Sequence, residues 1–223
     1  MFSPSIRAIA FDLDGTLVDS LTDIAAAANA ARAELGLTPL DDARVRSFIG
    51  DGSAMLMART ALDDPDAQVD DSALQTAARA HFNQHYARVV AEHTVPYPGA
   101  VEGLQALAAL GLPLACVTNK PIAFTTPLLA ALDLERYFEL VLGGDSLAAK
   151  KPDPLPLAHV AQTFAVAPAQ LLMVGDSHND VLAARAHGSP VLAVSYGYTP
   201  SASALGADRV IERIDQIPAL LAG

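Results

Sequence analysis

The chain has 223 residues, of which 52% are hydrophobic and 17% are charged, and this composition is typical of a globular protein rather than a disordered one. Its formal net charge of −11 would repel nucleic-acid phosphates and anionic lipid, so we expect no nucleic-acid or membrane partner. No apolar run approaches the ~18 residues of a membrane span, the N-terminus lacks a signal-like pattern, and the single cysteine, Cys116, cannot form an internal disulfide. We therefore predict a cytoplasmic protein.

The predicted elements change in kind along the chain. Residues 6–12 predict a buried strand, and residues from about 19 to 93 predict helices alone, because apolar residues recur there at helical spacing. From residue 95 onward, helices and strands alternate. The later strands are expected at 112–118, 139–144, 170–176, 190–194 and 208–212, and the helices at 99–110, 121–132, 154–164, 179–187 and 215–222.

This order of elements predicts an α/β protein with two domains. Strands that are apolar throughout and separated by helices imply a parallel sheet covered on both faces. The helical block interrupts that pattern after the first strand. We therefore expect a doubly wound, Rossmann-like parallel-sheet core domain of residues 1–16 and 96–223, with a small all-helical domain inserted at 17–95.

Two aspartates, Asp12 and Asp14, follow the first strand in the stretch DLDGT. If both residues stay extended, their side chains point the same way and repel, so the pair must share a proton, be fully solvated or collect a cation. The next residue, Gly15, permits a tight turn close to a ligand and so favours solvation or a cation. The alternative is an ordinary solvated strand end before a turn.

Polar residues also follow two of the later strands, and a loop with two lysines lies between those strands. Because ligands bind beyond the carboxyl ends of the strands in an open parallel sheet, we expect all of these side chains to meet in one crevice with the aspartate pair. The residues concerned are Thr118, Asn119, Lys120, Lys150, Lys151, Asp176 and Asp180.

Each of these groups has a plainer interpretation when it is taken alone. Thr118 and Asn119 could cap the helix that follows them. The two lysines could be solvated loop charges. Asp176 and Asp180 could be an N-cap and a first-turn acid of helix 179–187. The convergence of all of them on one sheet edge favours a site.

The four parts DLDGT, TN, KP and GDSxxD, in this order and spacing, resemble the haloacid-dehalogenase-like superfamily of phosphohydrolases. The inserted helices resemble the type of cap domain that closes over small soluble substrates in that superfamily. Within it, the stretches FIGDGSAMLMARTAL, GGDSLAAKKPDP and SYGYTP are similar to bacterial phosphoglycolate phosphatases. Sister families that act on other small phosphates share much of this narrower pattern.

The resemblance implies a phosphatase that depends on Mg²⁺. Asp12 would attack phosphorus and form an aspartyl phosphate, which water later releases. The ligands of Mg²⁺ would be Asp12, the backbone carbonyl of Asp14, and Asp176. The side chain of Asp14, which is not held by the metal, would act as a general acid toward the leaving alkoxide and then as a base toward water.

The remaining motif residues receive supporting roles from the same resemblance. Thr118 and Asn119 would donate hydrogen bonds to the transferred phosphoryl group. Lys151 would supply local positive charge, and we prefer it to Lys150 because it directly precedes the proline of the family pattern. Asp180 would orient a metal-bound water or Lys151.

The expected substrate is a small-molecule phosphomonoester, 2-phosphoglycolate, whose carboxylate calls for a cation or backbone donors in the cap domain. Arg46 and Arg59 flank the loop from Gly50 to Ser53, and these four residues are the candidates for substrate binding. The alternative for both arginines is an ordinary surface position on a helix. A monomer or a homodimer is expected.

Other functions remain open from the sequence. The substrate could be N-acetylmuramate 6-phosphate, a sugar phosphate or pyrophosphate. A phosphotransferase resembling β-phosphoglucomutase shares the core motifs, although its pattern places an arginine after the cap-loop serine, where this chain has Ala54. A phosphorylation-receiver module or a binding protein with a decayed site would belong to a different class, and turnover of a phosphate ester would exclude both.

Overall fold

The structure is a computed structural model that describes residues 5–222. The described chain divides into two compact units. The sheet unit contains residues 5–19 and 96–222, and the helical unit contains Ser20–Val95. The first of these boundaries lies three residues beyond the predicted one at 16/17, and residues 1–4 and 223 of the predicted core domain lie outside the described residues.

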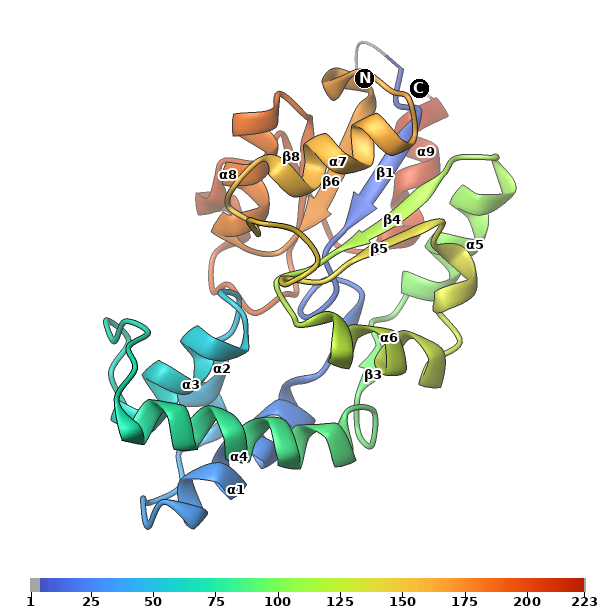
Figure 1. The fold of residues 1–223 in the computed structure, drawn as a ribbon. Coiled ribbons are helices and arrows are strands. Elements are labelled where there is room, and N and C mark those ends of the chain that lie inside the picture. Colours follow the sequence, from blue (N-terminus) through green and yellow to red (C-terminus); the bar gives the residue numbers. More distant parts are fainter. Residues whose placement is uncertain (1–4, 223) are drawn as a thin grey trace. The chain divides into compact units, whose positions relative to one another are not determined.

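The described part of the sheet unit contains a six-stranded parallel sheet in the order β5-β4-β1-β6-β7-β8 (Figure 1). Neighbouring strands are parallel throughout, and Phe11 of β1 lies opposite Cys116 of β4 and Val174 of β6. The strands are β1 (Ala8–Phe11), β4 (Leu114–Val117), β5 (Leu140–Leu142), β6 (Leu171–Gly175), β7 (Val191–Val194) and β8 (Arg209–Ile211). The predicted α/β class with a doubly wound parallel sheet is confirmed.

Helices cover both faces of this sheet, which explains why β1 and β6 are buried along their whole length. In Figure 1, α7 and α8 lie on one side of the sheet, and α5 and α9 lie on the other. Ala8 and Ala10 of β1 pack in one apolar cluster with Leu157 of α7 and Ala183 of α8. The helices are α5 (Ala100–Ala109), α6 (Ile122–Ala131), α7 (Leu155–Thr163), α8 (His178–His187) and α9 (Ile217–Ala222).

The sheet unit has a topological switch point at β1. From this strand the chain builds outward through β4 and β5, and later through β6, β7 and β8 on the other side. The carboxyl ends of β1, β4 and β6 therefore border one crevice, because neighbouring parallel strands end at the same edge and their crossovers diverge there.

The helical unit contains α1 (Leu21–Glu34), α2 (Asp42–Arg46), α3 (Ser53–Leu62) and α4 (Ala73–Val89). Phe82 and Tyr86 of α4 are buried and stack with ring centroids 5.3 Å apart. Helix α2 begins at Asp42, where the Asp41 side chain caps the helix by accepting a hydrogen bond from the Arg44 N–H, and it ends after only five residues. Among the described helices, none has the length and apolar character to cross a bilayer.

Two short strands, β2 (Val18–Asp19) and β3 (Val95–Pro96), pair as a two-stranded sheet where the chain passes between the units. The sequence pattern did not predict them, since two residues are too few to establish an alternation. Ser20 occupies the N-cap position of α1, but its side chain makes no capping hydrogen bond there.

Candidate active site

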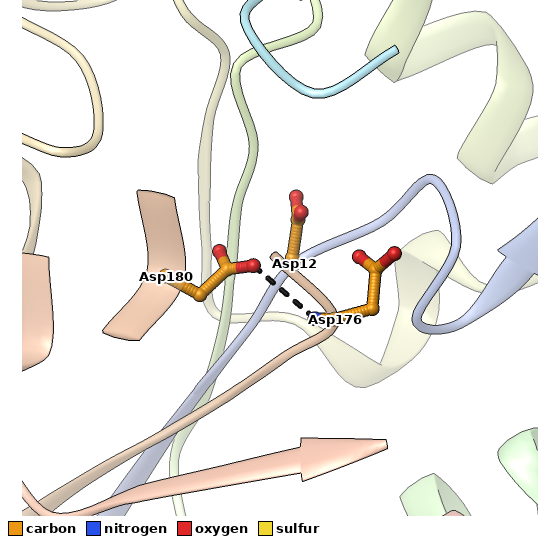
Figure 2. A group of neighbouring side chains, drawn as sticks. All are labelled: Asp12, Asp176 and Asp180. Atoms are coloured by element: carbon orange, nitrogen blue, oxygen red, sulfur yellow. Dashed lines mark hydrogen bonds between the residues drawn. The ribbon is translucent and has the colours of Figure 1, made fainter. Parts of the chain in front are cut away.

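The candidate active site begins where β1, β4 and β6 end in the sheet unit. Asp12 follows β1, Thr118 follows β4, and Asp176 follows β6. All three side chains are buried or nearly so, which places polar groups in a setting where each needs a partner. Figure 2 shows the carboxyl groups of Asp12, Asp176 and Asp180 facing a common space.

Asp12 is anchored by its own backbone and by a lysine. Its Oδ1 accepts a hydrogen bond from the Leu13 N–H at 2.8 Å, and the same oxygen lies 3.0 Å from Lys151 Nζ. Burial raises the pKa of Asp12 to about 6, although the charge of Lys151 acts in the opposite direction. A pKa of about 6 leaves this carboxylate mostly ionised at neutral pH, although burial limits its contact with water.

Lys151 is the central cation of the site and is only 2% exposed. Its Nζ lies 3.0 Å from Asp12 Oδ1 and 2.6 Å from Asp180 Oδ1. Burial disfavours the ammonium, but the two carboxylates outweigh burial and raise the pKa of Lys151. Of the two candidate lysines, the structure thus brings Lys151 to the aspartates. The Asn119 side-chain amide donates to the Lys151 carbonyl at 2.8 Å and so fixes this segment.

Asp180 lies in the first turn of α8, and both of its carboxylate oxygens accept hydrogen bonds from neighbouring residues. Its Oδ1 binds Lys151, while Oδ2 accepts from the Ser177 hydroxyl at 2.7 Å, the Ser177 N–H at 3.0 Å and the Asp176 N–H at 3.2 Å. The dashed line in Figure 2 marks the last of these bonds. The N-cap of α8 is Ser177, so the alternative that Asp176 caps this helix is wrong. Asp180 therefore links the start of α8 to Lys151 through its hydrogen bonds.

Asp176 sits in a tight enclosure of backbone. Its Oδ1 accepts from the Thr16 hydroxyl at 3.2 Å, and its Oδ2 accepts from the Tyr198 N–H at 2.7 Å. A Cβ on Gly197 would lie 2.2 Å from the Asp176 Cβ, and one on Gly15 would lie 2.5 Å from Asp176 Oδ2. Burial, together with the charges of Asp12 and Asp180, raises the pKa of Asp176 to about 8.

The three aspartates could hold a metal ion, since one carboxylate oxygen from each lies within 4.8 Å of the others. Asp180 already uses both of its oxygens, whereas Asp12 and Asp176 face each other with raised pKa values. A divalent cation bound by carboxylate oxygens would offset both the burial and the repulsion between carboxylates that raise these pKa values. The residues present therefore fit a hard divalent cation such as Mg²⁺.

Asp14 differs from the prediction in its side-chain environment. Strand β1 ends at Phe11, and Asp14 forms an isolated bridge with Val18 in the turn that follows. Both carboxylate oxygens of Asp14 accept from Lys120 Nζ, at 2.9 and 3.0 Å. The two neighbouring acids are therefore each paired with a separate lysine, Asp12 with Lys151 and Asp14 with Lys120.

Lys120 is a site residue to which the sequence analysis gave no role, although it was noted at the end of its strand. It is 7% exposed and directly follows Thr118 and Asn119, so its place after the same strand was a usable signal. Thr118 Oγ1 accepts from the Lys120 N–H at 3.2 Å. The N-cap of α6 is Pro121, so the alternative that Thr118 and Asn119 cap this helix is wrong.

The residues that hold Asp176 were also missed. Thr16, Gly197 and Tyr198 enclose its side chain, and the Tyr196 hydroxyl donates to the Thr16 carbonyl at 2.8 Å. The stretch SYGYTP was noted for its resemblance alone. A glycine between two tyrosines carries no general signal for packing against a carboxylate, so the sequence could not reveal this contact.

The four candidates for substrate binding lie in the helical unit. Gly50 has a φ of +128°, which glycine adopts easily, and Ser53 is the first residue of α3. Arg46 ends α2, and Arg59 on α3 forms an ion pair of 2.6 Å with Asp51. Their role in substrate binding stays a prediction.

The chain is similar to known proteins over nearly its whole length. A family model described as haloacid dehalogenase-like hydrolase matches residues 6–188. Phosphoglycolate phosphatase of Chromobacterium violaceum is 49% identical over 212 residues, which cover 95% of each chain. Phosphoglycolate phosphatase of Escherichia coli is 43% identical and covers 86% of this chain and 82% of its own.

A solved structure supports the same relationship. The crystal structure of a predicted phosphoglycolate phosphatase from Haemophilus somnus has a TM-score of 0.90 and 32% identity, and the match covers 96% of this chain and 97% of that one. The chain belongs to the haloacid dehalogenase-like hydrolase family. The predicted family and the predicted enzyme class, a phosphatase, are confirmed.

Proposed function

We propose that the protein hydrolyses 2-phosphoglycolate to glycolate and phosphate in a Mg²⁺-dependent reaction with an aspartyl-phosphate intermediate. The observation that carries the chemistry is the buried cluster in which Lys151 Nζ lies 3.0 Å from Asp12 Oδ1, with a carboxylate oxygen of Asp176 within 4.8 Å of one of Asp12 (Figure 2). The substrate is supported by the curated relatives, which are named phosphoglycolate phosphatases at up to 49% identity.

Asp12 is the proposed nucleophile. A carboxylate oxygen of Asp12 bonds to phosphorus while the bond between phosphorus and the ester oxygen breaks. Lys151 neutralises part of the negative charge that would otherwise repel the phosphate, and the buried setting strengthens this attraction. Thr118 and Asn119, buried beside the cluster, are proposed to donate hydrogen bonds to the transferred group.

Asp14 is the proposed general acid and base. Its carboxyl group gives a proton to the departing glycolate oxygen, and its carboxylate later takes a proton from the water that attacks the aspartyl phosphate. Lys120 binds both oxygens of Asp14, so it restricts the rotation of this carboxyl group between the two steps.

A magnesium ion would be held by Asp12, the backbone carbonyl of Asp14 and Asp176, and it would supply charge stabilisation for the phosphoryl oxygens. Asp180 acts on Lys151, because its Oδ1 lies 2.6 Å from Lys151 Nζ. For the carboxylate of the substrate, Arg46, Arg59 and the loop from Gly50 to Ser53 remain the candidates.

Phosphate release tests this proposal. The purified protein should release phosphate from 2-phosphoglycolate with a higher kcat/KM than from sugar phosphates, pyrophosphate or N-acetylmuramate 6-phosphate. EDTA should abolish the activity, and Mg²⁺ should restore it. Asp12→Asn should lower kcat at least about 10⁴-fold, because the variant has no carboxylate to form the ester, and acid-quenched wild-type enzyme should yield a peptide phosphorylated on Asp12.

Other outcomes would redirect the assignment. A preference for another small phosphate would keep the mechanism and change the substrate. Isomerisation of a sugar phosphate with little phosphate release would favour the phosphotransferase. Full activity in EDTA or in Asp12→Asn would contradict the mechanism itself.

A further inference from the structure

Two histidines and a glutamate form a cluster in the helical unit, apart from the residues of the proposed reaction. His81 and His85 are four residues apart on α4, so their side chains lie on the same face of that helix. His81 Nδ1 lies 2.5 Å from Oε2 of Glu34, the last residue of α1, and His85 Nε2 contacts the other oxygen, Oε1. One carboxylate thus has an imidazole nitrogen on each of its oxygens.

The position of Glu34 favours a cationic partner. The carbonyl end of a helix carries partial negative charge, so a carboxylate on the last residue of α1 adds to that charge instead of balancing it. The hydrogen bond from His85, and then the charges of His81, His85 and Arg88, lower the pKa of Glu34 although slight burial opposes them. Glu34 is therefore ionised at neutral pH, in a protein with a net charge of −11.

The cluster is open to ions from solution. The side chains of His81, His85 and Glu34 are 31%, 25% and 41% exposed. Their rings and carboxylate can therefore turn without disturbing a packed core. A cation can reach them directly from water.

We propose that Glu34, His81 and His85 bind one divalent transition-metal ion of the zinc or nickel class. Two histidines at this helical spacing on one face supply two nitrogen ligands, and a carboxylate from a neighbouring helix supplies a third. Imidazole nitrogen suits Zn²⁺, Ni²⁺ and Cu²⁺, whereas the all-oxygen aspartate set of the sheet unit suits Mg²⁺. The two places in the chain are therefore expected to take different metals.

Binding requires both histidine rings to move, because the ligand atoms of Glu34, His81 and His85 do not all lie within 4.8 Å of one another in the structure. The two rings turn from separate oxygens of Glu34 toward the shared ion, and water occupies the remaining coordination position. Any proton on either ligating nitrogen passes to solvent, so binding weakens as the pH falls. The ion would tie the end of α1 to α4 and stabilise the helical unit by mass action.

A titration of untagged protein with Zn²⁺, in saturating Mg²⁺ so that the aspartate site is occupied, tests the proposal. Isothermal calorimetry should find one Zn²⁺ site per chain. NMR should show the ring nitrogens of His81 and His85 shifting together as this site fills. Neither readout depends on phosphatase activity, so failure here leaves the proposed function untouched.

Variants assign the site to these residues. Glu34→Gln, His81→Gln and His85→Gln should each weaken Zn²⁺ binding at least about tenfold, whereas His159→Gln on α7, the matched control, should leave it unchanged. Arg88→Gln should tighten binding, because it removes a positive charge that acts on Glu34. Absence of a Zn²⁺ site in the wild-type protein, or equal binding in His85→Gln and His159→Gln, would overturn the proposal.

Discussion

Two buried aspartates, Asp23 in the helical unit and Asp176 in the sheet unit, have pKa values that are shifted in opposite directions. Asp23 is 1% exposed, and it accepts hydrogen bonds from the N–H groups of His93 and Thr94 and from the Thr94 hydroxyl, which at 2.6 Å is the closest of these donors. Burial raises the pKa of Asp23, but these bonds outweigh burial and lower it. Asp176 is also little exposed to solvent, at 3%, yet its pKa rises to about 8.

The difference lies in what surrounds each carboxylate. Asp23 faces donors from the segment at 93–94 and so ties the start of α1 to that segment. Asp176 has two donors, but it also faces Asp12 and Asp180. The first arrangement satisfies a buried charge and stabilises the fold, whereas the second disfavours the ionised carboxylate unless a cation is bound beside it. Low solvent exposure alone therefore does not distinguish a structural aspartate from a candidate metal ligand.

The largest effect is expected for Lys151→Gln, which removes the cation shared by Asp12 and Asp180. Two carboxylates would then be buried without their positive partner, and such a loss costs about 3–5 kcal/mol. Urea unfolding at pH 7.5 should show this loss. Lys150→Gln, the neighbouring control, should change stability by less than about 0.5 kcal/mol. Equal losses of stability in the two variants would contradict the assignment of Lys151 as the partner of Asp12 and Asp180.

Gly197→Ala tests whether the enclosure of Asp176 controls metal binding. The new Cβ would lie 2.2 Å from the Asp176 Cβ, so the side chain or the loop must move. We expect the Mg²⁺ concentration for half-maximal activity to rise at least about tenfold, equivalent to 1.4 kcal/mol, while Tm in EDTA falls by a few degrees. Ser195→Ala, an exposed position in the same segment, is the control. Unchanged Mg²⁺ dependence in Gly197→Ala would contradict the role of this loop.

Asp176→Asn should stabilise the metal-free protein, and the gain should depend on pH. Because the folded pKa of Asp176 is raised to about 8, the folded state holds a proton that the unfolded chain releases near pH 4. The stability of wild-type protein in EDTA therefore falls as the pH rises from 4 toward 8. At pH 8 the variant should be more stable by about 1–3 kcal/mol, and at pH 5 the two should be nearly equal.

Thermal unfolding in EDTA and in Mg²⁺ at both pH values measures this effect. Mg²⁺ should raise the Tm of the wild-type protein more at pH 8 than at pH 5, because bound metal replaces the proton. Asp176→Asn should respond much less to Mg²⁺. A gain for the variant that is the same at both pH values would exclude the titration of Asp176 as its cause.

Asp23→Asn should have the opposite sign and a smaller effect. An amide cannot accept as many hydrogen bonds as a carboxylate, so the variant should lose about 1–2 kcal/mol at pH 7. The folded pKa of Asp23 is lowered, so its contribution is present above the unfolded pKa near 4 and is lost as the pH falls through the folded pKa. Urea unfolding at pH 7 and pH 3 should show the difference between variant and wild type shrinking in acid.

Most elements of the fold could be predicted from the sequence, because their patterns are local and strong. The buried strands 8–11 and 171–175 are continuous apolar runs, and helices such as α4 show helical spacing behind a capping serine, Ser72. The short pair β2 and β3 was missed because two residues carry no periodicity.

The candidate site could be predicted in part. Residues at strand ends were placed together because the carboxyl ends of neighbouring parallel strands share one edge, and Asp12, Lys151, Asp176 and Asp180 do meet there. The pairing of Asp14 with Lys120 was not predicted, since these residues are 106 positions apart and nothing in either local sequence selects the other.

The sequence by itself determined the class of fold, the order of its elements and the set of polar residues at the sheet edge, because apolar periodicity and motif order are properties of the chain. The tertiary structure decided which lysine pairs with which aspartate. Lys120 binds Asp14 while Lys151 binds Asp12 and Asp180, and Asp176 lies against Gly197 and Tyr198 from a distant loop. Such partners depend on distances of a few ångströms between segments far apart in the chain, and these distances exist only after the sheet has assembled.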